Sequence, residues 1–560
     1  MKKKMVALML AGAMVLSLVA CGSKEEQSGS GKGQIEVDGN KLDTKQFYNG
    51  FMSSDPSTLD SAKGNDGYGN GVLLNIMEPL TRMDEQKGKN VRIGAAAESW
   101  ESNEDGTVWT FKLRDNKWAD GKEVTAEDYA YGIQYTLDQK TGSPNAYLIT
   151  CIKNGVAVNS GEKAVSDLGI KVIDKKTLEI TLENPTPYFL SLTDTRAMLP
   201  IRKDYVEKYG EAYGAEPEKV IGNGPFKIKK WTHNSEMLLE KSKEYWDQKN
   251  VYLTAINWKI ITDEIATFNS FENGSLDSCS SGTPEWIEKF KSKDNVVYTE
   301  SVVPSIRFFF FNTKDAFFKN ENIRKAFSIA IDRKDVAKTI FFDTMIPSYS
   351  WVPQGVSTGE QGDYRKQVKE PLKTMSKEED AKKLLLKGME ELGLGSDPSK
   401  VTVKFSMGGT NQWLRNFGEY FQQEYNKTLG VNIKLDANEW GTFQSKTNSG
   451  DYQMGYMVWG IDYNDPISML GLMQSKAGAI PTFWENKEYD ELIANASIEM
   501  NESKRVEMYK KAEELLFNGG CALCPVVNET SHAFRYSYIK NTSTLSFTTM
   551  GLKKVYTSGR

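Results

Sequence analysis

Cysteine and histidine, the side chains best suited to redox or metal chemistry, are sparse in this chain of 560 residues. Cys521 and Cys524 have the C-x-x-C spacing of redox and zinc sites. No second ligand pair accompanies them, and the residues that follow predict a strand instead of the helix that a redox motif would need. We therefore expect either a local disulfide or two buried thiols. With His233 and His532 as the only histidines, a histidine-rich metal site is excluded.

One carboxylate stands out by its position. Asp462 follows an apolar segment, Tyr456–Trp459, that predicts a strand, and it comes directly before a turn at Asn464–Pro466. A carboxylate placed there can pair with a cation, because a buried ammonium without such a partner costs several kcal/mol. Alternatively, Asp462 only caps the turn.

The first twenty-two residues carry an export signal. Three lysines within Met1–Lys4 precede the uncharged segment Met5–Ala20, which is shorter than the roughly 20 residues needed to span a bilayer. The ending Leu18–Gly22 resembles the lipobox of bacterial lipoproteins, in which the cysteine, here Cys21, takes a diacylglycerol and becomes the mature N-terminus. We expect a signal peptide over residues 1–20 and a membrane anchor at Cys21. An ordinary cleaved signal with a chance cysteine is the alternative.

Composition indicates an exported globular protein. The net charge of -5 is nearly balanced and no basic block is present, which argues against nucleic acid as a partner. The mean hydropathy is -0.51, and no apolar run after the signal is long enough to cross a membrane. A chain of this length is too long to fold around a single hydrophobic core, so two or three domains are expected.

Beyond the signal, residues 21–45 are rich in small and polar types and predict a flexible tether, with folded structure starting near Phe47. Strands and helices then alternate irregularly, which predicts a mixed α/β fold. A capping box is expected at Thr125–Asp128, and another at Ser376 and Glu379, with Gly393 ending the second helix. The other expected strands and helices are strands at Val108–Arg114, Leu178–Leu182, Met237–Glu240 and Val431–Leu435, and helices at Ile323–Phe341, Ser376–Leu392, Asn411–Lys427, Lys487–Glu499 and Glu502–Phe517.

Five sequence blocks, in order along the chain, resemble the large solute-binding proteins that feed peptide ABC transporters, the oligopeptide-binding family. Together they cover nearly the whole mature chain, and most of their residues are expected to be scaffold. Gly222–Phe226, for example, is too rich in glycine for the interior of an element and predicts a turn into the next strand. The blocks are Asp55–Asp60 with Asn75–Arg82, Ala97–Asp128, Gly222–Phe226 with Tyr245–Trp246, Phe311–Thr313 with Ile323–Arg333, and Trp459–Pro466.

The resemblance implies a two-lobed α/β fold of the periplasmic-binding-protein type, in the large class with an extra domain. Two chain crossings near Val303 and Pro525 would act as hinges, with the ligand enclosed between the lobes. The first lobe would take residues 46–77, 199–303 and 526–560, the extra domain residues 78–198, and the second lobe residues 304–525.

The resemblance also implies the roles of individual residues. Asp462 matches the aspartate that pairs with the ligand's α-amino group. Main-chain groups of Val458 and Gly460 would pair with an extended peptide, and Ala62 would contact it from the other side. Backbone pairing of this kind tolerates many ligand sequences.

Two tryptophans match family positions near the ligand. Trp440 would line a side-chain pocket and Trp459 would support the site by packing, although either could be plain core. Neither a metal nor a cofactor is implied.

The chain departs from the family where short-peptide members hold the ligand's C-terminal carboxylate with a lysine, a histidine or an arginine. The matching positions hold Phe341, Leu414 and Tyr456. Either the carboxylate is not clamped, as in members that accept longer peptides, or another cation takes over. The cations nearby in sequence are Arg307, Arg415 and Lys446.

The expected partners are a peptide ligand, the permease subunits of an ABC transporter and, through lipid on Cys21, the outer face of a membrane. We expect a monomer, and a Gram-positive cell, where no outer membrane would confine a free binding protein. Three alternatives remain open. A hydrolase is disfavoured, because no Ser-His-Asp or Cys-His set is suggested and His233 lies in an expected exposed turn. The same fold could bind nickel, haem or a sugar, or it could sense a peptide pheromone.

Overall fold

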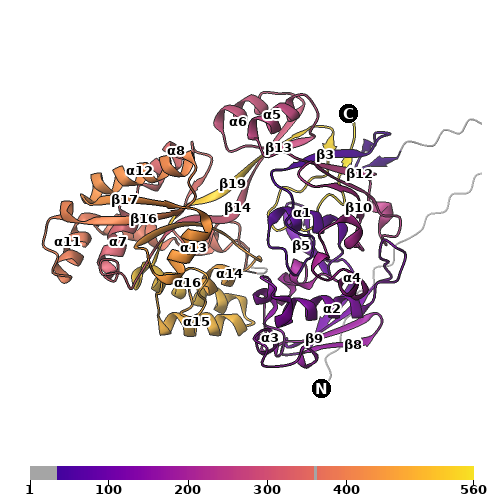
Figure 1. Ribbon diagram of the computed structural model, residues 1–560, viewed down its shortest axis with the longest axis horizontal. Helices are drawn as coiled ribbons and strands as arrows, with labels where there is room; N and C mark the ends of the chain where they lie inside the picture. Colours follow the sequence, from indigo (N-terminus) through magenta and orange to yellow (C-terminus); the bar gives the residue numbers. More distant parts are fainter. Residues whose placement is uncertain (1–34, 359–361) are drawn as a thin grey trace, which may run out of the picture. The chain divides into compact units, whose positions relative to one another are not determined.

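The computed structural model describes residues 35–358 and 362–560 (Figure 1). The expected signal peptide, Cys21 and the first part of the tether lie outside the described residues. The end of the expected tether belongs to a separate small unit and forms a hairpin of β1 (Glu36–Val37) and β2 (Asn40–Lys41). Asp38 and Gly39 between them have positive φ angles of 50° and 75°, as a two-residue hairpin turn requires. Local turn chemistry thus orders a segment whose composition predicts a flexible tether.

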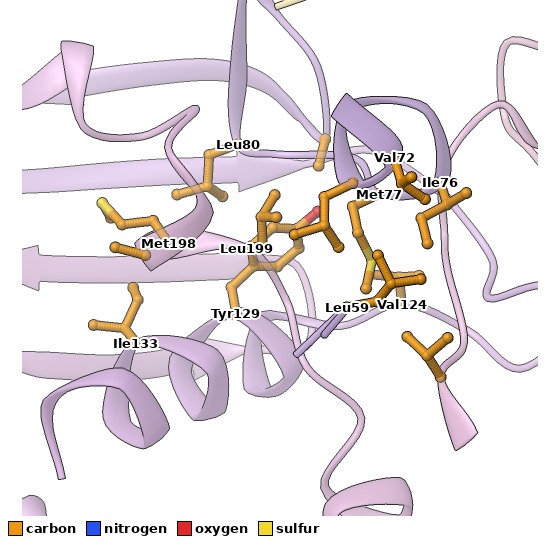
Figure 2. Close-up of a cluster of buried hydrophobic side chains, with 14 of the residues drawn as sticks. Leu59, Val72, Ile76, Met77, Leu80, Val124, Tyr129, Ile133, Met198 and Leu199 are labelled. Atoms are coloured by element: carbon orange, nitrogen blue, oxygen red, sulfur yellow. The ribbon is translucent and has the colours of Figure 1, made fainter. Parts of the chain in front are cut away.

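One large hydrophobic core is built from the first half of the chain and is completed by residues near the C-terminus. Figure 2 shows part of it, where side chains of α1 and α2 meet Leu80, Met198 and Leu199. The expected capping box opens α2: the Asp128 carboxylate accepts a hydrogen bond from the main-chain N–H of Thr125 at 2.8 Å. The helices of this part are α1 (Gly67–Ile76), α2 (Ala126–Leu137), α3 (Gly155–Asn159) and α4 (Lys203–Tyr209).

Two four-stranded sheets and a hairpin surround this core. One sheet has the strand order β10-β11-β12-β3, in which only the β12–β3 pair is parallel, and the other has the antiparallel order β6-β7-β9-β8. As expected, the Gly222–Pro225 turn leads directly into a strand. The strands are β3 (Phe47–Met52), β4 (Thr81–Gln86), β5 (Lys89–Gly94), β6 (Ala97–Ser102), β7 (Val108–Leu113), β8 (Ile170–Asp174), β9 (Thr177–Thr181), β10 (Phe226–Thr232), β11 (Glu236–Lys241) and β12 (Ala255–Ile260).

The rest of the chain is organised by a seven-stranded mixed sheet with the order β13-β19-β14-β18-β16-β17, to which β15 adds on β19. Successive side chains of a strand face opposite sides of a sheet. Accordingly, Phe309 and Phe311 enter one hydrophobic core and Phe308 and Phe310 enter another. The strands are β13 (Ser278–Ser280), β14 (Val296–Phe311), β15 (Ile346–Pro347), β16 (Thr402–Gly408), β17 (Asn432–Asn438), β18 (Met454–Gly460) and β19 (Leu523–Tyr536).

Helices complete these two cores, and a smaller fourth cluster forms around α5 and α6. Short strands β20 (Ile539–Lys540) and β21 (Tyr556–Thr557) pair near the C-terminus. The helices are α5 (Glu264–Glu272), α6 (Pro284–Lys291), α7 (Glu321–Ile329), α8 (Arg333–Thr339), α9 (Tyr364–Gln367), α10 (Pro371–Glu378), α11 (Ala381–Glu391), α12 (Gln412–Leu429), α13 (Trp440–Ser449), α14 (Ile467–Leu470), α15 (Lys487–Ile498) and α16 (Glu502–Asn518).

Two long strands, β14 and β19, run side by side as an antiparallel ribbon (Figure 1). Their register shifts between Val302 and Ile306 and again between Arg307 and Phe308. The expected crossing points Val303 and Pro525 both fall within these strands. Such bulges bend and twist a ribbon locally, and the hinge expected at this segment stays a prediction.

Two expected helices are each split by an aspartate. The single helix expected at Ile323–Phe341 is α7 and α8, because the Asp332 carboxylate accepts hydrogen bonds from two main-chain N–H groups and starts a new helix. The capping box expected at Ser376 and Glu379 is wrong: Ser376 lies inside α10, and Asp380 caps α11. Gly393 does end α11, with a φ of 69°.

Within residues 35–358 and 362–560, no helix combines the length and the apolarity needed to cross a membrane.

Candidate functional site

Asp462 lies two residues after the end of β18, at the border of two pockets. Its main-chain N–H donates a hydrogen bond to the Ser468 hydroxyl at 3.0 Å, while the residue itself is exposed. The smaller pocket, about 530 Å³, is lined by polar and apolar surface in about equal measure, and the larger, about 720 Å³, is lined mainly by apolar and aromatic side chains. Both pockets are lined by Asp462, Tyr463, Tyr147 and Leu148.

A neighbouring carboxylate, Asp465, fixes the loop that carries Asp462. The Asp465 carboxylate is buried and accepts hydrogen bonds from the Arg505 guanidinium at 2.5 Å and from the Tyr509 hydroxyl at 2.9 Å. Asn464 accepts a further bond from the main-chain N–H of Ser357 at 2.9 Å. These bonds hold the loop from both sides. The charge of Asp465 is balanced by a cationic partner inside the protein, and in this respect it differs from Asp462.

Asp462 has no such partner among the residues that the structure describes. Partial desolvation by the surrounding protein raises the pKa of its carboxyl, and a hydrogen bond from the Tyr147 hydroxyl partly opposes this. The pKa of Tyr147 is raised as well, first by burial and then by the charge of Asp462. A carboxylate in this state is stabilised by any cation that arrives.

Tyr147 was not among the expected site residues. It belongs to a short 3-10 helix, Ala146–Ile149, far from Asp462 in sequence. Nearby, Tyr188 and Tyr463 stack with ring centroids 5.1 Å apart and planes inclined by 13°, so the two halves of the chain also meet through aromatic rings beside Asp462.

The outer edge of β18 is open next to Asp462. On one side, β18 pairs with β14 along the whole length of β18. On the other side, β18 pairs with β16 only as far as Tyr456. The N–H of Ile461 donates to the carbonyl of Pro304 in β14 at 3.0 Å. Pro304 comes directly before Ser305, where the pairing of β14 with β18 begins. Because main-chain groups alternate in direction along a strand, those of Val458 and Gly460 face away from β14. Both residues are exposed, and the edge they form is geometrically able to accept another strand.

The two expected tryptophans lie near this edge. The Trp459 side chain lines the larger pocket. Trp440 begins α13, is 52% exposed, and stacks on Phe443 with ring centroids 5.5 Å apart. Its ring packs over Gly408, the last residue of β16, at the point where the pairing of β18 stops.

Ala62 is the residue expected to contact the ligand from the side opposite β18. It is fully buried, its N–H donates to Asp60 at 2.9 Å, and its carbonyl accepts from Ser143 at 2.6 Å and from Asn145 at 3.0 Å. Both main-chain groups are therefore already bonded inside the protein, and the nearby residues that line the smaller pocket are Asn65, Asp66 and Gly67. Contact between Ala62 and a ligand stays a prediction.

The three positions that lack the family cations do come together. Phe341, Leu414 and Tyr456 are all buried in one core beneath the sheet. Arg307 from β14 reaches this cluster and donates a hydrogen bond to the Tyr456 hydroxyl at 2.8 Å.

The other two candidate cations are placed differently. Lys446 bonds Asn438 at 2.8 Å, and Arg415 is exposed on α12.

The C-x-x-C cysteines are two buried free thiols, so the disulfide alternative is not realised. Cys521 donates to the Ser328 hydroxyl at 3.2 Å, and burial raises its pKa to about 12. His233 lies in an exposed turn beside Asp55, at 2.6 Å, as expected. Among the described residues, no group of three histidine, cysteine or acidic side chains could hold a metal ion.

The sequence and the fold of this chain are both similar to those of known proteins. The chain is 33% identical over 518 residues to the dipeptide-binding protein DppE of Bacillus subtilis, covering 92% of each chain. A crystal structure of the substrate-binding domain of an oligopeptide ABC transporter from Bacillus anthracis is similar with a TM-score of 0.77 and 31% identity, covering 92% of this chain and all of the other. Haemophilus influenzae OppA in complex with the peptide RPPGFSPFR is similar with a TM-score of 0.78 and 25% identity, covering 93% of this chain and all of the other.

These neighbours confirm the two-lobed α/β fold of the periplasmic-binding-protein type. Residues 93–480 match the bacterial extracellular solute-binding proteins, family 5 (middle region), a class of binding proteins and not of enzymes. The chain belongs to the family 5 extracellular solute-binding proteins of bacteria.

Proposed function

We propose that this protein is the substrate-binding component of an ABC importer and captures peptides by pairing their α-amino group with Asp462. The observation that carries the proposal is the state of Asp462: a carboxylate with a raised pKa, no cationic partner among the described residues, and two pockets beside it. A protonated amine supplies the missing charge. The Tyr147 hydroxyl, from a part of the chain far from Asp462 in sequence, would hydrogen-bond the same carboxylate.

The open edge of β18 would hold the ligand's backbone. An extended peptide that starts at Asp462 can run along Gly460 and Val458 as an added strand, using main-chain hydrogen bonds. Such pairing is independent of ligand side chains. The relative from Haemophilus influenzae that was solved with RPPGFSPFR supports a groove that accepts peptides longer than two residues.

Capture would be completed by closure of the lobes. We assign residues 46–77, 199–303 and 526–560 to the first lobe, residues 78–198 to its extra domain and residues 304–525 to the second lobe. The hinge would be the ribbon of β14 and β19, at its register shifts. A peptide that bridges Asp462 and Tyr147 would stabilise the closed state. Its binding would therefore shift the population of molecules from the open to the closed state.

The remaining parts of the proposal concern location. Lipid on Cys21 would anchor the protein to the outer face of the membrane, in a Gram-positive cell, and would keep it near its permease at high effective concentration. The support is the sequence of residues 1–22. We expect a monomer, because one chain contributes both walls of the site.

Native mass spectrometry of the purified protein tests the central claim. We expect co-purified peptides that leave upon unfolding, and no cleavage products when defined peptides are added. Titration calorimetry then compares one peptide with its N-acetylated form, which lacks the ammonium but keeps the backbone. Equal affinity for the two forms would overturn the role of Asp462, and binding of a sugar or haem in preference to any peptide would overturn the substrate class.

A further inference from the structure

Arg307 on β14 and Glu529 on β19 form an ion pair in the same sheet, one strand and two strands away from β18. The Arg307 guanidinium donates to the Glu529 carboxylate at 2.6 Å, and each side chain is 21% exposed. In the β-ladder Arg307 is directly opposite Val458, so their side chains share a face of the sheet. The guanidinium also donates to the hydroxyl of Tyr456, a residue of β18 two positions from Val458.

The surroundings of Arg307 hold it in place. The guanidinium carbon is 5.6 Å from the centroids of both the Phe341 and Trp413 rings. Two of its nitrogens are engaged by Tyr456 and Glu529, and the third, Nε, is buried and has no hydrogen-bond partner in the described part of the chain. Its charge is matched by Glu529 at hydrogen-bonding distance, before any ligand binds.

A carboxylate of the ligand would have to compete for this cation. A peptide with its ammonium at Asp462 runs back along β18 at about 3.3 Å per residue, so its fourth or fifth residue reaches the level of Val458, which is opposite Arg307 in the ladder. At that point it would meet a guanidinium that is already paired, and Glu529 would repel an added negative charge. Arg307 is close enough to hold a peptide's C-terminus, but Glu529 opposes this role.

We propose that Glu529 is a specificity-determining residue: by neutralising Arg307, it makes the groove indifferent to the ligand's C-terminal carboxylate. The inference rests on the proposed peptide-binding function. It assigns a ligand class, namely peptides that are recognised by their amino end and backbone, whether they end at this point, extend beyond it or carry a blocked C-terminus.

The test compares peptides of three to six residues, each as free acid and as C-terminal amide, by titration calorimetry. For the wild-type protein we expect acid and amide to differ by no more than about 2-fold at every length. In Glu529→Gln the arginine loses its counter-charge, so the free acid of four or five residues should bind about 10-fold more tightly than its amide. The matched control is Glu300→Gln in β14, whose exposed carboxylate accepts from Tyr298 and should leave the ratio unchanged.

The double variant Arg307→Gln/Glu529→Gln identifies the cation responsible. It should return the acid-to-amide ratio to about 2-fold or less, because both charges are gone. The inference is overturned if the wild type prefers free acids by about 10-fold, if Glu529→Gln shows no acid preference at any length, or if the preference persists in the double variant. A wild-type protein that binds no peptide of either form overturns the proposed function itself, which is a distinct result.

Discussion

Asp462 and Arg307 flank the open stretch of β18, and the surrounding protein balances their charges in different ways. Arg307 is paired with Glu529 at 2.6 Å and bonded to Tyr456. Asp462 has only the Tyr147 hydroxyl and, among the described residues, no cation. A charge that the protein leaves unbalanced in a pocket favours a ligand of opposite charge, whereas a balanced one makes no such demand. If peptides bind as proposed, the comparison teaches that the two ends of one groove differ in what they recognise: the amino end of a peptide is selected and the carboxyl end is not.

Removing the charge at the unbalanced end should have the largest effect. In Asp462→Asn we expect peptide affinity to fall about 100-fold, because the ligand's ammonium would lose the carboxylate with which it pairs. Titration calorimetry with a peptide of five residues measures this. Asp451→Asn, which changes an exposed aspartate before β18, is the control. An Asp462→Asn protein with full affinity would remove the basis of the comparison.

The part of the groove between the two ends should contribute through the backbone. Methylation of one ligand amide that faces β18 should lower affinity about 10-fold, since it removes a hydrogen bond and leaves a strand carbonyl unpaired. Methylation of the next amide, which faces away, is the control. Equal losses at both positions would show that the ligand does not pair with β18 as a strand.

A smaller effect is expected from the hydroxyl that contacts Asp462. Tyr147→Phe keeps the ring and removes the bond to the carboxylate, so affinity should fall about 5-fold. Tyr209→Phe, on α4 and outside both pockets, should change nothing. A Tyr147→Phe protein with unchanged affinity would mean that Tyr147 only packs against the site.

The dependence of peptide affinity on pH also tests the comparison. Near neutral pH, this is the smallest of the expected effects. Because the pKa of Asp462 is raised in the free protein, the affinity for peptides should begin to fall at a higher pH than for an ordinary aspartate, as the carboxyl takes up a proton. Above about pH 8 the affinity should fall again, because the peptide's α-amino group loses its proton. Calorimetry between pH 4 and 9 measures both limbs. The acidic limb should be absent from Asp462→Asn, and its persistence there would assign it to another group.

The fold was largely predictable because the five family blocks span the chain and most helix caps are local in sequence. The two errors in helix boundaries share one cause. At Asp332 and Asp380 a side-chain cap interrupts a run whose apolar spacing continues through the break, so periodicity alone predicts one helix where there are two. The hairpin at residues 36–41 is the reverse case, in which two turn residues order a polar segment.

The site was predictable in part. The position of Asp462 and the alternation that turns Val458 and Gly460 outward follow from one short motif and strand geometry. Tyr147 and Glu529 could not be found in this way, because each reaches its partner only through the tertiary fold. No local pattern in the sequence marks either residue.

The open edge of β18 has a consequence for how such a protein can change over evolutionary time. Its hydrogen-bonding groups belong to the peptide backbone, so substitutions at Val458 or Gly460 leave them in place, with proline as the exception because it lacks the N–H. If ligands pair with this edge as proposed, neighbouring side chains such as Trp440 and Trp459 can therefore vary without abolishing capture. Variants with new preferences can remain functional at every step, and the range of nutrients taken up can drift without passing through an inactive intermediate.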